Sequence, residues 1–193
     1  GSLSLALNND FTQGVELQEG TLRVQAEGAL GSGSLHAAAG TSLVVENGTA
    51  LDLSATTDST LAGNVEVAQE SSLKMQVDAD SSYTAQNTVL NGSLELSSAA
   101  DNQTVGTEVL SGSGRLELVA GSGSLAFTAN LNDGFTGDLI AGGEGNSIEV
   151  KHGGYEGSGT ISAYAGGSIS FTGEHGGVRL LDGAVLSVDA ESS

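Results

Sequence analysis

Apolar residues in this chain return at a nearly constant interval of about 22 positions, and this periodicity constrains the fold more than any other feature. One ladder advances by 21 to 24 positions at each step, through Leu51, Leu73, Leu94, Leu116, Leu139, Ile161 and Val185. A second consists of Leu22, Leu43, Val65, Val89, Leu110 and Leu131, and a third of Val105, Leu125, Ile148 and Ile169. Self-similarity at a short fixed period is the signature of a solenoid, in which each coil of chain stacks on the previous one.

Between the ladder positions, apolar residues alternate with polar or small ones in short bursts, as in Leu73-Met75-Val77. A period of two is the pattern of a β-strand with one buried face. Gly, Asn, Asp and Ser separate the bursts, and these residues tolerate turn dihedrals. No stretch carries an apolar stripe of helical period that is long enough for a helix. Three short strands per coil must stack laterally and in parallel, so the sequence predicts an all-β parallel β-helix of about nine coils.

Two other interpretations compete with the β-helix. A sandwich or an up-and-down barrel also has short strands about every 8–12 residues, but neither explains why three ladders share one period. Disorder is compatible with a Gly- and Ser-rich acidic chain, but 38% of the residues are apolar and they are regularly placed. Proline is absent, as expected when internal strands must all donate their ladder hydrogen bonds. One continuous core is sufficient for this length, so we expect a single domain over residues 1–193.

The chain is strongly acidic, with a formal net charge of −19 from 24 acidic and five basic residues. Binding to nucleic acid or to anionic lipid needs clustered cations, so neither is an expected partner. Cysteine is absent, and a chain without disulfides can remain unlocked while it passes through a pore. There is no run of about 18 apolar residues and no recognisable signal peptide. Gly1-Ser2 resemble a cloning remnant, and we expect the chain to be a piece of a larger protein.

A motif in three parts lies near the start of the chain: Phe11-Thr12-Gln13-Gly14, then Gly20-Thr21-Leu22-Arg23-Val24, then Ala29-Leu30-Gly31. It resembles the passenger-associated repeat of bacterial autotransporters, and the good match covers about 30 residues. A weaker second copy occupies residues 132–150, where the spacing after the phenylalanine is two residues longer and Gly-Thr-Leu is lost.

The resemblance implies a right-handed β-helix that is displayed on the surface of a Gram-negative bacterium or secreted from it. Export would use a C-terminal outer-membrane barrel that lies outside this chain. Passengers of this family are mostly adhesins and self-association factors, with a minority of proteases and esterases. The expected role is therefore adhesion, self-association or biofilm formation, and the expected partner is the same protein on neighbouring cells, a host-surface protein or a glycan. A stalk or folding module with no ligand of its own remains the alternative.

The sequence contains no established catalytic motif. Neither the nucleophile-elbow pattern Gly-x-Ser-x-Gly nor the Gly-Asp-Ser-Gly box of protease passengers occurs. The histidines are His36, His152 and His175, and we expect them on turns or exposed faces rather than in a Ser-His-Asp triad. His152 and His175 lie 23 positions apart, about one coil, but a site with two histidines lacks a third metal ligand. The sequence therefore predicts no enzyme, no metal site and no cofactor.

Three acidic pairs have a spacing that suggests a glycosidase or calcium site: Asp78 with Asp80, Glu66 with Glu70 and Glu144 with Glu149. Glycoside chemistry needs two converging carboxyls and aromatic rings to hold the sugar, but the chain has only three Tyr and four Phe. The calcium-binding nonapeptide and the twelve-residue calcium loop are absent. We interpret these pairs as a solvated acidic surface, and a polysaccharide-active enzyme is the least expected function.

Two tyrosines suggest a binding patch. Tyr155 and Tyr164 flank a predicted strand in the Gly-rich stretch 153–167. His152 comes directly before this stretch, and His175 is expected to stack on His152 one coil later. We predict that these four residues form an exposed patch that contacts a sugar or a neighbouring protein. The alternative is that both tyrosines pack at a corner with their hydroxyl groups in water.

Overall fold

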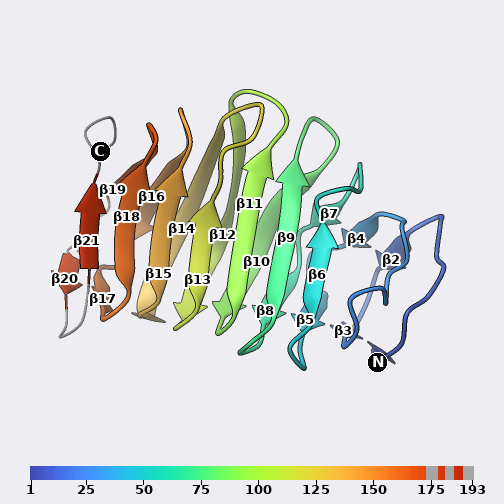
Figure 1. Cartoon of the computed structure of the whole chain (residues 1–193). Helices are drawn as coiled ribbons and strands as arrows, with labels where there is room; N and C mark the ends of the chain where they lie inside the picture. The colour runs from blue at the N-terminus through green and yellow to red at the C-terminus, as the bar shows by residue number, and fades with distance from the viewer. Residues whose placement is uncertain (173–177, 181–184, 189–193) are drawn as a thin grey trace.

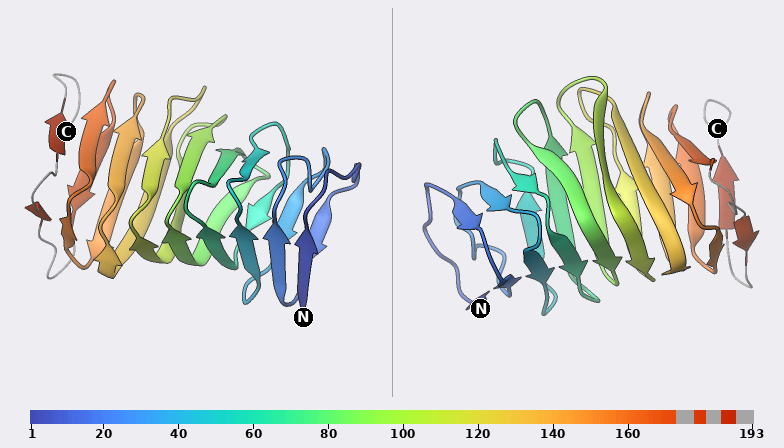
Figure 2. Two further views of the ribbon diagram at one scale, coloured as in Figure 1. Left: turned by 60° about the horizontal axis from the view of Figure 1, so that its bottom comes forward. Right: turned by 180° about the vertical axis from the view of Figure 1, so that it is seen from behind.

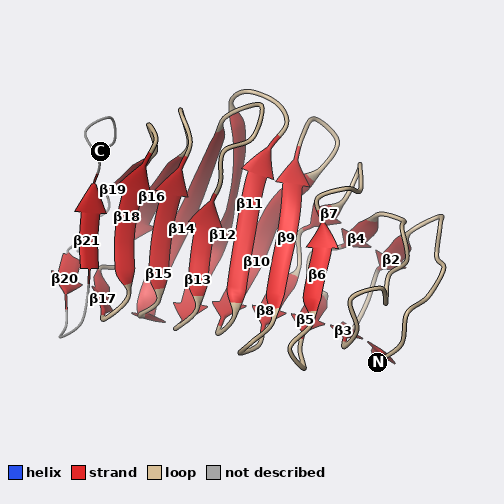
Figure 3. Ribbon diagram, viewed as in Figure 1, coloured by secondary structure: helices blue, strands red, loops and turns tan. Residues whose placement is uncertain are grey.

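The computed structural model describes residues 1–172, 178–180 and 185–188, with the backbone alone at residues 132 and 133. All regular structure in this part of the chain is β-strand, from β1 to β21, which confirms the predicted all-β class (Figure 3). Among the described residues, no helix is long and apolar enough to cross a membrane.

The strands line three faces of one solenoid, and all pairings between described strands are parallel. A 12-stranded sheet carries the first face and most of the second, and three long strands pass from one of these faces to the other. A separate two-stranded sheet completes the C-terminal end of the second face. These long strands are β10 (Ser82–Leu90), β12 (Gln103–Gly112) and β14 (Leu125–Phe135).

Shorter strands complete the first two faces. The first face contains β2 (Val15–Leu17), β4 (Leu35–Ala37), β7 (Thr60–Leu61), β16 (Ser147–His152) and β19 (Ser168–Phe171). The second face contains β1 (Ser2–Leu5), β3 (Thr21–Val24), β5 (Ser42–Val45), β8 (Asn64–Val67), β17 (Tyr155–Gly157) and β20 (Val178–Leu180).

The third face is a separate sheet of seven strands. In chain order these are β6 (Ala50–Leu53), β9 (Ser72–Val77), β11 (Ser93–Ser98), β13 (Arg115–Leu118), β15 (Asp138–Gly142), β18 (Thr160–Tyr164) and β21 (Val185–Val188). In the first two coils this face is replaced by segments 6–14 and 25–34, which have no regular strand. These segments contain parts of the autotransporter-like motif, and they pair through the Phe11 carbonyl, which accepts from Ser32 and Gly33 N–H.

The solenoid is right-handed. In Figure 1 the strands of the third face point upward in front, and the chain advances from the N-terminus on the right to the C-terminus on the left. The strands behind them point downward, as the rear view in Figure 2 shows. A chain that rises in front, crosses over the top and advances to the left makes right-handed turns. There are about eight turns of about 22 residues rather than nine coils, because the nine strands along the second face are joined by eight turns.

The predicted ladder on the third face is confirmed from Leu51 to Ile161, where each residue lies opposite the next in the parallel register. All of these side chains are buried. The last step is wrong: Ile161 lies opposite Leu186, and Val185 lies opposite Thr160. The interval from Ile161 to its partner Leu186 is therefore 25 positions, one more than the ladder assumed.

The second ladder contains one misplaced residue. Val89 is half-buried on the outer side of β10, and Thr88 takes the core position opposite Val65. A polar residue fits this core position because the Thr88 hydroxyl lies 2.8 Å from the hydroxyl of buried Tyr83. Apolar periodicity alone does not reveal such a partner.

The third ladder also shifts at one step. Phe127, not Leu125, lies between Val105 and Ile148 in the stack. Both Leu125 and Phe127 are buried, since they are two positions apart and face the same side of β14. The period identifies the face correctly but cannot choose between two apolar residues on it.

Buried polar side chains join successive coils at the corner between the third and first faces. Ser59 Oγ accepts from Leu35 N–H at 3.1 Å, and Ser81 Oγ accepts from Ser59 N–H at 3.2 Å. Further along, Asn146 Oδ1 accepts from Leu125 N–H at 2.9 Å. In each case a side chain of the later coil accepts a hydrogen bond from a buried backbone N–H of the earlier coil. A buried N–H group needs an acceptor, and here the side chain provides it.

Candidate functional site

The structure does not bring the predicted patch together. His152 is exposed at the end of β16 on the first face, whereas Tyr164 is exposed at the end of β18 on the third face. Tyr155 lies in the core, with only 1% of its surface exposed. His175 lies outside the described residues. Exposure of Tyr155 beside His152 is therefore a wrong prediction, and only Tyr164 remains as an exposed aromatic ring of this group.

Tyr155 is held inside the solenoid by contacts on both ends of its side chain. Its hydroxyl donates to Gly137 O at 2.7 Å, and its ring packs edge-on against Phe135 with centroids 6.5 Å apart. Burial raises the pKa of Tyr155 above its ordinary value of 10.0. A tyrosine with a satisfied hydroxyl and a packed ring serves stability, not ligand binding.

The outer surface of the third face carries a row of residues, each one position after a buried ladder residue. The row contains Asp52, Lys74, Glu95, Glu117, Ile140 and Ser162, which lie opposite one another on β6, β9, β11, β13, β15 and β18. Adjacent rungs of a parallel sheet are about 4.8 Å apart. Side chains of this row therefore reach from one strand to the next.

Two ion pairs lie on this face. Lys74 Nζ is 3.1 Å from Glu95 Oε2, across β9 and β11. Arg115 Nε and Nη2 both donate to Glu117 Oε2, at 2.9 and 2.6 Å. Two of the chain's five basic residues are thus paired with two carboxylates. The centre of the third face is charge-balanced, although the chain as a whole carries −19.

Tyr164 lies across this face because Gly142 leaves space for it. The two residues are opposite each other in β18 and β15. A Cβ atom at Gly142 would overlap Cζ, Oη and Cε2 of the Tyr164 ring. The ring therefore covers the Gly142 backbone and extends toward β13, where its hydroxyl donates to Glu117 Oε1 at 3.3 Å. We call Tyr164, Gly142, Glu117 and Arg115 the Tyr164 site.

Tyr164 is 38% exposed, and one side of its ring contacts the sheet while the other faces solvent. Partial burial, together with the nearby Glu117 carboxylate, raises the pKa of Tyr164 above its ordinary value of 10.0. The phenol consequently remains protonated at neutral pH and donates its hydrogen bond to Glu117. The site offers an open aromatic face with a carboxylate and a guanidinium at its edge.

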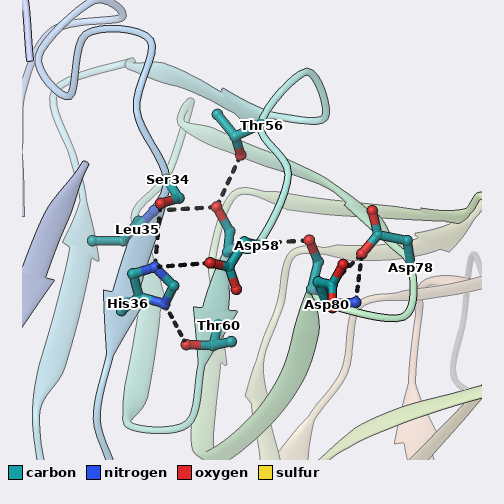
Figure 4. A network of polar contacts seen from close by, with 10 residues as sticks. Ser34, Leu35, His36, Thr56, Asp58, Thr60, Asp78 and Asp80 are labelled. Carbon is teal, nitrogen blue, oxygen red and sulfur yellow. Dashed lines mark hydrogen bonds and ion pairs between the residues drawn. The ribbon is translucent and has the colours of Figure 1, made fainter. Parts of the chain in front are cut away.

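A second polar cluster surrounds His36 on the first face, as Figure 4 shows. His36 Nε2 lies 3.2 Å from Ser34 Oγ and 3.8 Å from Asp58 Oδ2, and Nδ1 lies 3.1 Å from Thr60 Oγ1. In a Ser-His-Asp triad the serine and the carboxylate contact opposite ring nitrogens. Here both are near Nε2, so the cluster does not have the geometry that would activate Ser34.

The acidic pairs from the sequence do not converge on a common point. Asp78 Oδ1 accepts from Asp80 N–H at 2.9 Å and from Ser81 N–H at 2.7 Å, and these bonds lower the pKa of Asp78. Asp78 therefore stabilises a turn (Figure 4). Glu149 accepts from the Thr172 hydroxyl at 2.8 Å. Within the described ranges, no group of three or more His, Cys, Asp or Glu residues is arranged to hold a metal ion.

The other pairs lie on the surface. Glu66 and Glu70 are both exposed, as is Glu144. Glu149 also lies 3.9 Å from Lys151 Nζ. These carboxylates fit the predicted solvated acidic surface.

An open groove of about 390 Å³ crosses β10, β12 and β14, where the first face bends into the second. Gly106 lies between Thr84 and Thr128 in register, and all three residues line the groove. Glu108 and Lys151 lie on the rim. The groove has a size typical of ligand sites, but it presents no aromatic ring.

Tyr164 was predicted from the sequence as a binding residue, whereas Glu117 and Arg115 were not. A signal for the row was present, because Lys74, Glu95 and Glu117 each follow a leucine of the ladder by one position. The same period that stacks the leucines inside places these three residues side by side outside.

No known protein family, no curated protein and no solved structure matches this chain. The class that the fold defines is a parallel β-solenoid.

Proposed function

We propose that this chain is a surface-displayed segment of an autotransporter-type passenger that acts in adhesion or self-association. The solenoid fold and the motif at residues 11–31 both fit such a passenger. In this proposal the third face makes the contact, because it combines regular strands with a row of outward residues that are polar in five of six positions, Ile140 being the exception. Contacts that repeat along an axis add up, so weak single contacts are sufficient.

The observation that carries the proposal is the charge balance of the third face. Two copies of a chain with charge −19 repel each other at long range. The Lys74–Glu95 and Arg115–Glu117 pairs make this face the one on which the local repulsion is small. Added salt screens the remaining long-range repulsion. Self-association through this face is therefore expected to strengthen as salt increases.

Sedimentation velocity at low and high salt tests the proposal. Ser93→Asp adds a negative charge at the centre of the third face, on β11, and is expected to weaken association. Ser170→Asp adds the same charge on the first face, on β19, and is expected to leave it nearly unchanged. A chain that remains monomeric at about millimolar concentration in high salt contradicts self-association and favours a stalk role.

Surface display is tested separately. Intact cells of the source bacterium are expected to bind an antibody raised against the chain, without permeabilisation. Labelling that requires permeabilised cells contradicts display.

A further inference from the structure

We propose that the Tyr164 site binds an uncharged carbohydrate, with one sugar ring stacked on the open face of Tyr164. The inference rests on the proposed adhesive function and names a ligand class for it. It is carried by the position of the ring, the groups at its edge and the charge of its surroundings.

The position of the ring is fixed on two sides. Below it, the Gly142 backbone acts as a floor, and a Cβ atom at this position would displace the ring. At its far end, the hydroxyl is bonded to Glu117 Oε1, and Glu117 is itself held by two hydrogen bonds from Arg115. An aromatic side chain that is already ordered loses little entropy when a ligand covers it. The open face is therefore ready for stacking.

The groups at the edge of the ring suit hydroxyl groups. The Glu117 carboxylate accepts hydrogen bonds, and the Arg115 guanidinium donates them through a planar fork. A sugar ring has an apolar C–H face, which fits an aromatic platform, and hydroxyls around its rim. Ligand sites commonly combine an aromatic surface with a few fixed polar groups. The Tyr164 site has both parts within three successive rungs of the third face, β13, β15 and β18.

The surroundings favour a neutral ligand over a charged one. Glu117 is paired with Arg115, and Glu95 with Lys74, so neither basic group is free to bind an anion and neither of these two carboxylates is free to bind a cation. A protein partner would be expected to cover a larger apolar patch around its aromatic anchor. The nearby polar side chains on β13 and β18 are Glu117, Arg115 and Ser162. Ile140, the apolar outward residue on β15 between them, is buried and offers little surface to a protein partner.

The test is a titration of the chain, followed by NMR of its tyrosine rings. The probes are neutral oligosaccharides of glucose, galactose, mannose and N-acetylglucosamine. Because the chain has only three tyrosines and no tryptophan, the ring signals of Tyr164 can be separated from those of buried Tyr83 and Tyr155. We expect at least one of these sugars to shift the Tyr164 signals with a dissociation constant of about 1 mM or tighter.

Three variants separate stacking from the hydroxyl contact. Tyr164→Ala removes the ring and is expected to weaken binding at least about tenfold. Gly142→Ala keeps the tyrosine but displaces it, because the atoms nearest to the new Cβ all belong to the Tyr164 side chain, and a similar loss is expected. Tyr164→Phe keeps the ring and loses only the bond to Glu117, so a loss of about two- to threefold is expected. Phe11→Ala is the matched control, since Phe11 is also 38% exposed but lies at the other end of the solenoid.

The outcomes distinguish this inference from the proposed function. Binding to a neutral sugar should be insensitive to salt, whereas self-association should strengthen with it. No shift with any of the sugars overturns the carbohydrate site and leaves salt-dependent self-association standing. Equal binding by wild type, Tyr164→Ala and Gly142→Ala also overturns it. If Tyr164→Ala abolishes self-association while no sugar binds, the ring serves contact between copies instead.

Discussion

The hydroxyl group of Tyr83 lies 2.8 Å from the hydroxyl group of Thr88, five residues further along the same strand, and both residues are completely buried. Strand β10 bends between them as it passes from the first to the second face, so the two side chains meet inside the core. Each hydroxyl satisfies the other in a place that water does not reach. This pair is what allows threonine to occupy a position of the aliphatic ladder.

Removing either partner of this pair should destabilise the chain. Tyr83→Phe leaves the Thr88 hydroxyl unpaired and is expected to lower the free energy of unfolding by about 1–2 kcal/mol. Thr88→Val does the same to the Tyr83 hydroxyl. The double variant should cost clearly less than the sum of the two, because it leaves no buried hydroxyl unpaired. Urea unfolding followed by circular dichroism measures all four proteins. Strict additivity would contradict the coupling, and exposed Tyr164→Phe should stay within about 0.5 kcal/mol of wild type.

Asn146 is the corner residue whose loss should be most costly. Its amide donates to Val119 O at 3.0 Å and to Gly142 O at 2.6 Å, and its Oδ1 accepts from Leu125 N–H. Asn146→Ala leaves these three backbone groups without that partner in a buried site, and we expect a loss of about 3 kcal/mol. Asn130→Ala is the comparison, because Asn130 donates one bond to Glu108 O at the surface. That change should cost less than about 1 kcal/mol, and equal losses in the two variants would argue against the role of the corner.

The stacked leucines of the third face should contribute most in the middle of the solenoid. Leu94→Ala removes a fully buried side chain between Leu73 and Leu116 and is expected to cost about 3 kcal/mol. Leu3→Ala is the same change at the start of the solenoid, on β1 of the second face, where the side chain is 56% exposed, and should cost less than about 1 kcal/mol. Thermal and urea unfolding of both variants measure the difference. Similar losses would mean that burial along the axis is not the main source of stability.

The fold could be predicted from the sequence because the period of the coil and the period of the strand act independently. The first stacks Leu73, Leu94 and Leu116, and the second decides which side chains face inward. The second and third ladders were wrong at positions where the two periods allow more than one residue to face the core. Thr88 could not be chosen over Val89, since its partner Tyr83 is visible only in three dimensions.

The candidate site was predictable in part. Ile161 and Ala163 alternate inward on β18, so Tyr164 follows as an outward residue. Tyr155 had no such guide, because β17 is only three residues long, follows Gly153-Gly154 and ends at Gly157, so there is no apolar alternation to count. Its burial depends on the Gly137 carbonyl and the Phe135 ring, both supplied by the preceding coil.

Alkaline pH should unfold this chain through its two buried tyrosines. Burial raises the pKa of Tyr83 and of Tyr155 above the ordinary value of 10.0. Just above pH 10.0, both phenols therefore keep their protons in the folded chain but lose them in the unfolded chain. Their contribution to stability is therefore complete below pH 10.0 and is lost as the pH rises above it. Urea unfolding midpoints, measured from neutral to strongly alkaline pH, should decrease once the pH rises above 10.0. Tyr83→Phe should fall less steeply than wild type, since it has one buried phenol fewer. A slope that is unchanged in Tyr83→Phe would show that another group drives the alkaline transition.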